Sequence, residues 1–468
     1  MITYVSNVLT IDDPLPELVT WVTTNLRLKN PEYYKKMQMG KWVGNTPESI
    51  RLFEWHSKTR LVVPYGCLSF LPYIHDYPIM DCIKQNHPST VRGLVDLYDY
   101  QKEAKTQMLS NYCGILKAPP GSGKTQIALS VAQTIHRRTL WVTHTKDLLM
   151  QSYNRAAQYF GKEHLGIITE GKIECGEFIT FATVQTLCGI DLDRYKDFWD
   201  LIIVDECHRV CVSAKSVGMF EKVLNNLSAK WKYGLSATVH RSDGLIFATI
   251  CLLGKVIAEI DKEAVGDKIT SVLVQPVLTD WKITDECLGT DGMLNYAKML
   301  EQMVFDNNRN IKIVKEIVRN GDKPSLVLSA RVEHLKQLYK MLPSRLQDVA
   351  CIIDGSMTSK VDKLCRERYI EQMRNGEKKI LFATYQLAKE GLDIPRLEVL
   401  HLTTPQTDYA VVAQSIGRVA RSYDGKGQPT VYDYIDKSKY LLKGFKKRIT
   451  TYKKENCEIR EVMNDEHL

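Results

Sequence analysis

The stretch Ala118-Pro119-Pro120-Gly121-Ser122-Gly123-Lys124-Thr125 decides the fold of this chain. The apolar run Gly114-Ile115-Leu116 comes just before it, and residues 126–136 have the composition of a helix. A strand, a glycine-containing loop and a helix in this order are the surroundings that a phosphate-binding loop requires. The motif therefore predicts an α/β lobe that binds the phosphates of a nucleotide.

The residues of this loop have distinct physical tasks. Gly121 and Gly123 let backbone N–H groups close around phosphate oxygens, and the N-terminus of the following helix adds partial positive charge. Lys124 is expected to reach the β- and γ-phosphates, and Thr125 to offer its hydroxyl to Mg²⁺. The expected nucleotide-binding residues of the loop are Pro120, Gly121, Ser122, Gly123, Lys124 and Thr125.

A pair of carboxylates follows a second apolar run. Leu201-Ile202-Ile203-Val204 leads directly into Asp205 and Glu206. The carboxyl end of a parallel strand faces the crevice in which α/β proteins bind ligands. Asp205 is therefore expected to hold Mg²⁺, and Glu206 to orient and deprotonate the water that attacks the γ-phosphate.

Two arginines further along the chain complete the expected chemistry. The window Gln414-Ser415-Ile416-Gly417-Arg418-Val419-Ala420-Arg421 places two arginines three residues apart, on one face of a predicted helix. Positive charge near the γ-phosphate stabilises the transition state of phosphoryl transfer. The predicted catalytic residues are Lys124, Asp205, Glu206, Arg418 and Arg421.

Short apolar runs that alternate with helical stretches predict two successive α/β lobes. Runs of four or five apolar residues that end at turn residues are typical of buried parallel strands, so each lobe is expected to be a doubly wound sheet. The runs lie at 114–116, 140–142, 178–181 and 201–204 in the first lobe, and at 325–328, 350–353, 380–383, 399–402 and 430–433 in the second.

The predicted organisation has four parts. Residues 1–90 are expected to form a small α+β accessory domain, with short strands at 61–64 and 69–71. The first lobe covers residues 91–260, and residues 261–300 link or elaborate. Residues 301–468 form the second lobe, which ends in a basic tail.

The overall composition is that of a soluble globular protein. Hydrophobic residues make up 44% and charged residues 25%, and no run approaches the roughly 20 apolar residues of a membrane helix. The N-terminus lacks the pattern of a signal or transit peptide. None of the 12 cysteines forms a CxxC pair, which fits a reducing compartment. A cytoplasmic protein without a membrane partner is expected.

Positive charge gathers in two segments of this chain, whose net charge is +8. Residues 437–454 hold eight basic residues and no acidic one, and residues 25–60 hold eight against three. Basic and aromatic side chains together are typical of a nucleic-acid surface. A solvated amphipathic helix is the alternative for 437–454, and a small domain with an aromatic core is the alternative for 25–60. The aromatic residues in question are Tyr33, Tyr34, Trp42, Phe53 and Trp55.

Taken together, these motifs resemble those of the superfamily 2 helicases, DExH branch, over roughly residues 97–436 and in the family's order. Val239-His240-Arg241-Ser242-Asp243-Gly244 is most similar to the XPB and phage UvsW branch, whose members act on duplex or branched DNA. The resemblance implies two RecA-like lobes, the use of ATP with Mg²⁺, and nucleic acid as the partner.

The resemblance also implies roles for single residues. Gln101, in Leu97-Tyr98-Asp99-Tyr100-Gln101, would read the adenine base, and Gly391 and Asp393 would lie near ATP. The residues expected to contact the nucleic-acid backbone are Thr143, His144, Thr183, Arg331 and Thr384. Those expected to couple the state of ATP to the grip on the strand are His208, Ser236, Thr238 and Gln414.

The function implied is that of an ATP-dependent DNA helicase or translocase that moves on or remodels duplex or branched DNA. It would act as a monomeric motor in the cytoplasm of a bacterial or phage-infected cell, with DNA favoured over RNA. An RNA helicase is one alternative. The motor subunit of a restriction or anti-phage complex is another, and it would need a partner chain for cleavage.

Two further classes explain the sequence less well. A kinase or another P-loop enzyme does not account for the window 414–421, which begins 290 residues after Lys124. A nucleic-acid-binding scaffold with an inactive ATPase does not account for the complete set of catalytic residue types.

Overall fold

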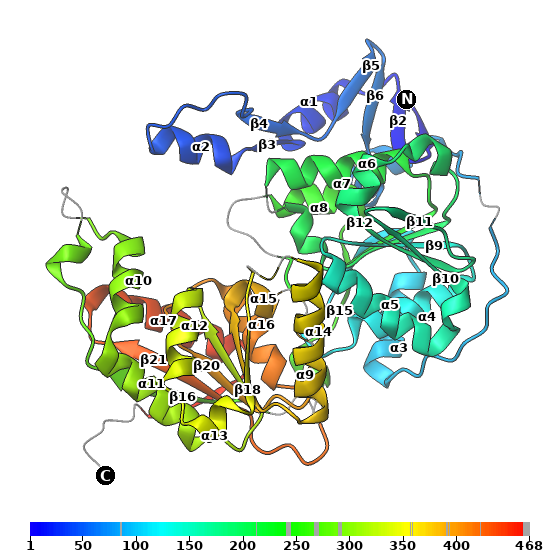
Figure 1. Cartoon of the computed structure of the whole chain (residues 1–468). Helices are drawn as coiled ribbons and strands as arrows, with labels where there is room; N and C mark the ends of the chain where they lie inside the picture. Colours follow the sequence, from blue (N-terminus) through cyan, green and yellow to red (C-terminus); the bar gives the residue numbers. More distant parts are fainter. Residues whose placement is uncertain are drawn as a thin grey trace. The chain divides into compact units, whose positions relative to one another are not determined.

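The computed structural model describes residues 1–84, 87–211, 213–239, 245–265, 271–288, 293–355, 357, 359–389, 392, 394–421 and 423–461. The chain divides into two compact units, Met1–Val265 and Gly266–Leu468 (Figure 1). Each unit is built around its own, mainly parallel, sheet. In this described part of the chain, no helix combines the length and the apolar character needed to cross a bilayer.

The main sheet of the first unit has eight strands in the order β11-β10-β12-β9-β13-β14-β8-β15. Neighbouring strands are parallel except for the β10–β11 hairpin. Every residue of β9, β12 and β13 is buried, as expected of strands covered on both faces. The strands are β8 (Cys113–Lys117), β9 (Thr139–Thr143), β10 (Leu165–Thr169), β11 (Lys172–Glu174), β12 (Ile179–Thr183), β13 (Leu201–Val204), β14 (Trp231–Ser236) and β15 (Val256–Glu259).

Helices cover both faces of this sheet, because side chains alternate between the faces along each strand. Ile202 and Val204 pack with residues of α6 and α7, whereas Ile203 between them points to the opposite face. The doubly wound architecture is therefore confirmed for the first unit. Its helices are α3 (Asp99–Leu109), α4 (Lys124–Ile135), α5 (Lys146–Phe160), α6 (Val184–Gly189), α7 (Ala214–Asn226), α8 (Ile246–Leu253) and α9 (Lys262–Val265).

The N-terminal residues form a second, smaller sheet with the strand order β5-β6-β2-β1-β7. Its strands are antiparallel except for β7, which runs parallel to β1. The elements of this module are β1 (Ile2–Val5), β2 (Val8–Asp12), α1 (Pro16–Asn25), β3 (Arg27–Lys29), α2 (Pro31–Gln38), β4 (Ser49–Arg51), β5 (Glu54–Ser57), β6 (Arg60–Pro64) and β7 (Ile79–Asp81). The predicted α+β character and the strand at 61–64 are confirmed, whereas residues 65–69 form a 3₁₀ turn and not a strand at 69–71.

The N-terminal module shares its core with the first lobe. Leu9 and Val63 belong to the same apolar cluster as Val217 of α7 and Cys251 of α8, and β2 and β6 lie beside these helices in Figure 1. A Cβ on Gly66 would come within 2.3 Å of the backbone nitrogen of Gly254, so the two backbones are in direct contact. The expectation of a separate domain over residues 1–90 is therefore corrected: one folded unit runs from the N-terminus to α9.

The second unit contains a seven-stranded sheet in the order β18-β19-β17-β20-β21-β16-β22, and all its strands are parallel. One of them corrects the predicted linker at 261–300, because β16 pairs with β21 over seven residues. The strand was not predicted from the sequence, because Pro276 interrupts its apolar pattern. The strands are β16 (Leu273–Thr279), β17 (Ser325–Ser329), β18 (Ala350–Ile353), β19 (Ile380–Thr384), β20 (Val399–Leu402), β21 (Thr430–Asp436) and β22 (Glu458–Ile459).

Two apolar clusters lie on the two faces of this sheet. Leu326 and Leu328 belong to one cluster, and Val327 belongs to the other. The second unit is therefore also doubly wound, as predicted. Its helices are α10 (Tyr296–Phe305), α11 (Asn307–Arg319), α12 (Val332–Lys340), α13 (Ser344–Gln347), α14 (Lys360–Asn375), α15 (Tyr385–Lys389), α16 (Tyr409–Val419) and α17 (Lys439–Lys454).

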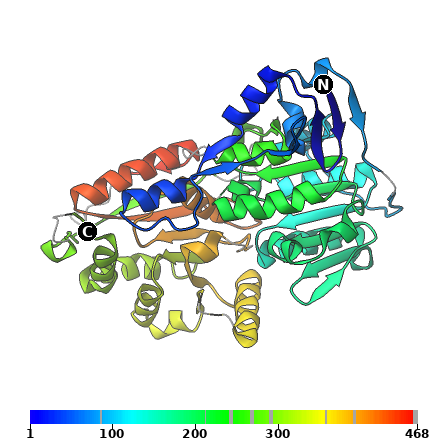
Figure 2. The same cartoon turned by 90° about the horizontal axis from the view of Figure 1, so that it is seen from above.

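Most of the basic segment 437–454 forms the amphipathic helix α17 (Lys439–Lys454), and its contact with nucleic acid stays a prediction. Phe445 and Tyr452 are buried in the core of the second unit. In Figure 2 the helix, in red, lies along the orange strands of its own sheet. Its lysines point away from this core and are exposed.

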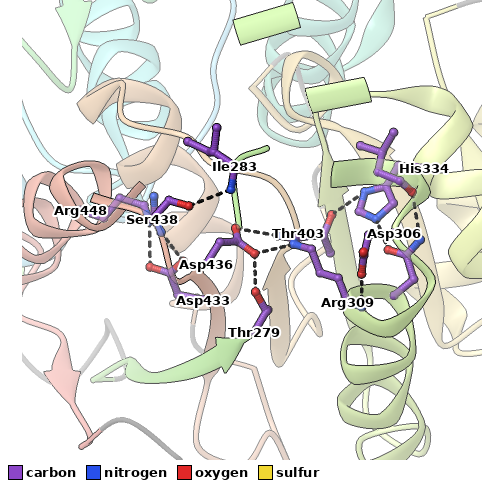
Figure 3. Close-up of polar contacts among 12 residues, drawn as sticks. Thr279, Ile283, Asp306, Arg309, His334, Thr403, Asp433, Asp436, Ser438 and Arg448 are labelled. Carbon is purple, nitrogen blue, oxygen red and sulfur yellow. Dashed lines mark hydrogen bonds and ion pairs between the residues drawn. The ribbon is translucent and has the colours of Figure 1, made fainter. Parts of the chain in front are cut away.

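Strand β21 carries two buried carboxylates on opposite faces, each paired with an arginine (Figure 3). The Nε of Arg309 on α11 lies 2.7 Å from Asp436 Oδ1, and Thr279 also donates to Asp436. On the other face, Arg448 of α17 donates two bonds of 2.8 Å to Asp433. A buried charge needs such a partner, so these pairs fix which helix lies on which face of the sheet.

Replacing Arg309 by methionine should lower the free energy of unfolding of the second unit by roughly 3–5 kcal/mol, because Asp436 would stay buried without its partner. Urea denaturation of the variant measures this loss. Lys315→Met is the matched control on the same helix, since Lys315 is exposed, and its effect should stay within about 0.5 kcal/mol. Equal losses in the two variants would contradict the assigned importance of the pair.

Candidate functional site

The expected site residues of the first unit gather at one edge of its sheet. Strands β8, β9, β12, β13 and β14 are parallel, so their carboxyl ends meet at the same edge. The segments that follow directly, or end these strands, are 118–125, Thr143, Thr183, Asp205 and Ser236. Five separate predictions from the sequence therefore converge on one place in the fold.

The loop 118–125 has the backbone of a phosphate cradle. Gly121 and Gly123 have φ angles of +84° and +81°, which favour glycine. Ser122 is fully buried and donates to the carbonyl of Pro119 at 2.7 Å. Lys124 opens helix α4 and donates to the carbonyl of Ala118 at 3.0 Å. Backbone N–H groups, a helix N-terminus and a lysine are thus concentrated where phosphate oxygens would bind.

Gln101 fastens this loop to helix α3. Its Nε2 donates to the carbonyl of Ser122 at 2.9 Å, and its Oε1 accepts the backbone N–H of Tyr98 at 2.9 Å. A Cβ on Gly123 would come within 2.3 Å of Nε2, so only glycine allows this approach. Gln101 therefore positions the loop, and its role in reading the base stays a prediction.

The two carboxylates after β13 differ in their surroundings. Asp205 accepts from Ser152 Oγ at 3.1 Å and from the backbone N–H of Glu206 at 2.9 Å. Burial and the charge of Glu206 raise the pKa of Asp205. Burial alone would raise the pKa of Glu206 too, but the hydrogen bond from His208 and the charge of Lys124 outweigh it and lower that pKa. On titration with acid, Glu206 therefore keeps its charge to a lower pH than Asp205 does.

Hydroxyl, carboxylate and backbone N–H groups are the donor set that a nucleotide with Mg²⁺ requires. Thr125 follows Lys124 in α4, and Lys124 is close enough to affect the pKa of both carboxylates. Glu206 has a φ of +48°, a strained value for a residue with a side chain. The residues of this edge therefore fit the predicted ligand.

A chain of short polar contacts links Glu206 to the end of β14. His208 Nδ1 lies 3.2 Å from Glu206 Oε2 and 3.1 Å from Ser236 Oγ. Ser236 Oγ donates to the carbonyl of Thr238 at 2.7 Å and accepts its N–H at 3.1 Å. The structure thus brings together three of the four residues expected to couple hydrolysis to movement.

Two of the expected strand-contacting residues of the first unit, Thr143 and Thr183, are buried. Thr143 is fully buried, and its hydroxyl donates to the carbonyl of Thr145 at 3.0 Å. Thr183 caps α6 and pairs with the hydroxyl of Thr186 at 2.9 Å. Both hydroxyls shape their own turns, and their contact with a bound strand stays a prediction.

His144 lies at the surface of the same edge and is half-buried. The exposed Gln185 donates to the His144 carbonyl at 3.0 Å and lies 3.3 Å from its Nδ1. Burial, followed by the charges of Arg209 and His208, lowers the pKa of His144. Gln185 was not predicted, although its place in Thr183-Val184-Gln185-Thr186 was a usable signal.

Two strand-contacting candidates lie at the carboxyl edge of the second sheet. Arg331 is exposed just after β17, and Thr384 ends the neighbouring β19. Two hydrogen bonds fix the turn at Arg331. The backbone N–H of Arg331 donates to Ser329 Oγ at 3.1 Å, and the backbone N–H of Ala330 donates to Thr404 Oγ1 at 2.9 Å. His334, labelled in Figure 3, lies 3.0 Å from the same Ser329 Oγ.

The arginine window behaves differently from the prediction in one respect. Gln414 and Arg418 lie on α16, but this helix ends at Val419, so Arg421 follows the helix and does not share its face. Arg418 donates to the carbonyls of Ala388 and Leu392 at 3.0 and 2.9 Å, which ties α16 to the segment after β19.

Lys426 braces the end of this window by donating to the carbonyl of Arg421 at 2.7 Å. Burial lowers its pKa to about 8. Gly391 and Asp393, expected near ATP, lie outside the described residues.

Two family models match this chain. The model described as "Type III restriction enzyme, res subunit" matches residues 94–241, and the "Helicase conserved C-terminal domain" matches residues 309–423. The chain belongs to the superfamily 2 helicases, of the XPB/UvsW-like type. Members of this family are nucleic-acid-dependent ATPases, and the matched ranges contain the loop 118–125, Glu206 and Arg418.

The relatives of this helicase include proteins of viruses and archaea. An Acanthamoeba polyphaga mimivirus protein named as an ATP-dependent RNA helicase is 27% identical, over 76% of this chain and 66% of its own length. The DNA 3′-5′ translocase XPB2 of Sulfurisphaera tokodaii is 24% identical, over 71% and 80%. The ATP-dependent DNA helicase uvsW of phage T4 is 22% identical, over 72% and 68%. The helicase thus covers just under two thirds of the first relative.

Solved structures support the fold of the helicase. Dbp5 of S. cerevisiae, bound to RNA and ADP BeF3, superposes with a TM-score of 0.55 at 16% identity, over 81% of this chain and 90% of that one. A fragment of a type I restriction enzyme HsdR subunit from Vibrio vulnificus gives 0.56 at 18% identity, over 78% and 67%. The two RecA-like lobes are confirmed by these neighbours.

Replacing Glu206 by glutamine should lower ATP turnover by at least about a hundredfold, because the amide keeps the shape of the side chain but cannot accept the proton of the attacking water. ATP affinity, measured by calorimetry, should stay close to that of the wild type. Glu163→Gln, on an exposed turn of the same unit, is the matched control and should retain full turnover. Wild-type turnover in the Glu206 variant would remove this residue from the mechanism.

Proposed function

We propose that this helicase is an ATP-dependent DNA translocase that remodels duplex or branched DNA. The observation that carries this proposal is the path from Glu206 through His208 to Ser236 and Thr238. It connects the group that would activate water to a segment at the strand-binding edge of the same sheet. A change at the γ-phosphate would therefore alter the grip on the nucleic acid through a few short bonds.

In the proposed ATP chemistry, the backbone of residues 121–125 binds the phosphates and Lys124 neutralises the β- and γ-phosphates. Thr125 and Asp205 would hold Mg²⁺. When bound, this ion acts as a Lewis acid and stabilises negative charge on the phosphate oxygens. Glu206 takes the proton of the attacking water. Arg418 and Arg421 supply positive charge as the transition state forms.

In the proposed strand contact, Arg331, Thr384 and His144 bind the sugar–phosphate backbone. Contacts of this kind fix the register of the protein on the strand without reading its sequence. A motor that must move along any sequence needs this lack of specificity. Arg331 is the strongest of the three, since it is exposed and charged at a braced turn.

The choice of DNA rests on the names of relatives. The T4 and Sulfurisphaera tokodaii proteins are named for action on DNA, and the mimivirus protein for action on RNA. The phage relatives also favour a bacterial or phage-infected cell as the setting. RNA is the second candidate substrate, and the stimulation of ATP hydrolysis by each nucleic acid distinguishes the two.

A motor subunit of a restriction complex is supported by the description of the model that matches residues 94–241 and by the HsdR neighbour. A partner chain would then have to supply the nuclease. The motor chemistry described here would be unchanged.

We further propose that the N-terminal module adds a nucleic-acid contact. Helix α2 has no buried residue, and Trp42 just after it is 88% exposed. The core of the module contains Tyr65, and Trp21, Phe53 and Phe70 pack against it, so an aromatic core explains Phe53 but not Trp42. Lys41, next to Trp42 in the sequence, and Lys35 on α2 are exposed, and basic and aromatic side chains together suit the backbone and bases of a strand.

ATP hydrolysis should rise strongly with duplex or forked DNA and much less with RNA of the same length. The purified protein is assayed with each nucleic acid in turn. Lys124→Ala should show no hydrolysis with any of them, which excludes a contaminating ATPase. Stimulation by RNA alone would overturn the DNA assignment, and no stimulation by any nucleic acid would overturn the proposed motor.

Replacing two lysines of the N-terminal module by alanine should weaken DNA binding mainly by reducing the electrostatic, salt-dependent contribution to the affinity. For Lys35→Ala/Lys41→Ala, the slope of log affinity against log salt should fall by about one for each lysine. Lys58→Ala, at the exposed β5–β6 turn, is the control and should keep the wild-type slope. Unchanged slopes in all variants would assign the module another role.

A further inference from the structure

Two exposed tyrosines lie beside the braced turn of Arg331. Tyr296 begins α10 and is 42% exposed, and Tyr440 in the first turn of α17 is 54% exposed. Tyrosine rings bury large areas when they are free to pack, so two rings left open at one place need a reason. We call these residues the tyrosine pair.

The loop Thr404-Pro405-Gln406 fixes the position of Tyr296 relative to Arg331. Thr404 Oγ1 accepts the N–H of Ala330 at 2.9 Å, and the carbonyl of Pro405 accepts the hydroxyl of Tyr296 at 3.1 Å. The two contacts are made by adjacent residues of this loop. Tyr296 is thereby held next to the turn that carries Arg331.

Helix α17 places Tyr440 near the same loop, which continues to Thr407. A Cβ on Gly444, one helical turn further on, would come within 3.3 Å of Thr407, and residues four apart share a helix face. Arg448, on the next turn, donates to the carbonyl of Gln406 at 3.4 Å. Tyr440 therefore belongs to the face of α17 that lies against the loop 404–407.

The start of α17 is fastened to the segment that carries α10. Lys437 N–H donates to the carbonyl of Trp281 at 3.1 Å, and Ile283 N–H donates to Ser438 Oγ at 2.9 Å (Figure 3). Leu441 packs in one cluster with Met299 and Met303 of α10. The tyrosine pair is therefore held on rigid elements of one unit.

Positive charge surrounds this place. Lys439 and Lys443 are exposed on α17 beside Tyr440, and Arg331 is exposed across the loop. Burial and then the neighbouring Tyr440 raise the pKa of Tyr296, whereas the charges of Arg448 and Arg331 act in the opposite direction. The influence of Tyr440 and Arg331 on the pKa of Tyr296 agrees with their closeness to Tyr296, which the contacts of the loop 404–407 also indicate.

We propose that the tyrosine pair binds the unpaired bases of a DNA strand whose backbone is held by Arg331. This inference rests on the proposed function. Basic side chains bind the phosphates, and aromatic rings stack on bases of any sequence, so the combination suits single-stranded nucleic acid. In a paired duplex the bases are stacked on one another, and the rings then have nothing to stack on.

A strand without bases distinguishes stacking of bases on an aromatic ring from binding of the sugar–phosphate backbone. Binding of the full chain is measured with a single-stranded oligothymidylate, with the same sugar–phosphate backbone lacking bases, and with a duplex. For Tyr296→Ala/Tyr440→Ala, affinity for oligothymidylate should fall about tenfold or more. Affinities for the abasic strand and the duplex should stay within about twofold of the wild type.

Three further variants keep the result interpretable. Tyr296→Phe/Tyr440→Phe retains both rings and should bind oligothymidylate like the wild type, which separates stacking from loss of the Tyr296 hydroxyl. Leu442→Ala, an exposed residue on another face of α17, is the matched control and should change nothing. Arg331→Ala should weaken binding of the abasic and base-containing strands alike.

The outcomes are distinct. Equal losses on the abasic and base-containing strands in the double alanine variant would overturn base stacking. Wild-type affinity in that variant, with weakened binding in Arg331→Ala, would overturn this inference and leave the proposed function standing. Failure of the wild-type protein to bind any nucleic acid would instead overturn the proposed function.

Discussion

Parallel pairing of strands is the constraint on which the rest of this structure depends. In a parallel sheet, the segments that follow the strands all begin at the same edge, where the carboxyl ends of the strands lie. In the first unit this places the loop 118–125, Glu206 and Ser236 in a row, although they are far apart in the sequence. Because the hydrogen bonds between the strands place these segments side by side, short side-chain contacts such as that between His208 and Ser236 are enough to connect them.

In the second unit, buried charge adds a further constraint to the sheet. Asp433 and Asp436 lie on opposite faces of β21, and each accepts an arginine from a different helix. Removing charged groups from water is costly, so neither helix has another position in which its arginine is equally well paired. The place of α17, and with it that of Tyr440, follows from this pairing.

The sequence was sufficient for the parts of this fold that rest on local chemistry. Glycines at positive φ and apolar runs before carboxylates are local signals, and they predicted Gly123 and Asp205 in their observed places. Contacts that depend on tertiary packing left no such signal. Ser152, a serine within a helix, holds Asp205, and the burial of Thr143 follows from the strands on either side of it. Strand β16 was missed because its pattern is interrupted by a proline.

Arginines and hydroxyls that hold only the backbone do not distinguish a paired strand from an unpaired one. A protein that acts at a branch point needs a second kind of contact, and an aromatic ring provides it because bases become available only when the strands separate. The tyrosine pair lies next to Arg331 on a shared loop, so one short stretch of strand would meet both kinds of contact. Recognition of unpaired DNA would then depend on the second unit, whereas the carboxylate proposed to activate water belongs to the first.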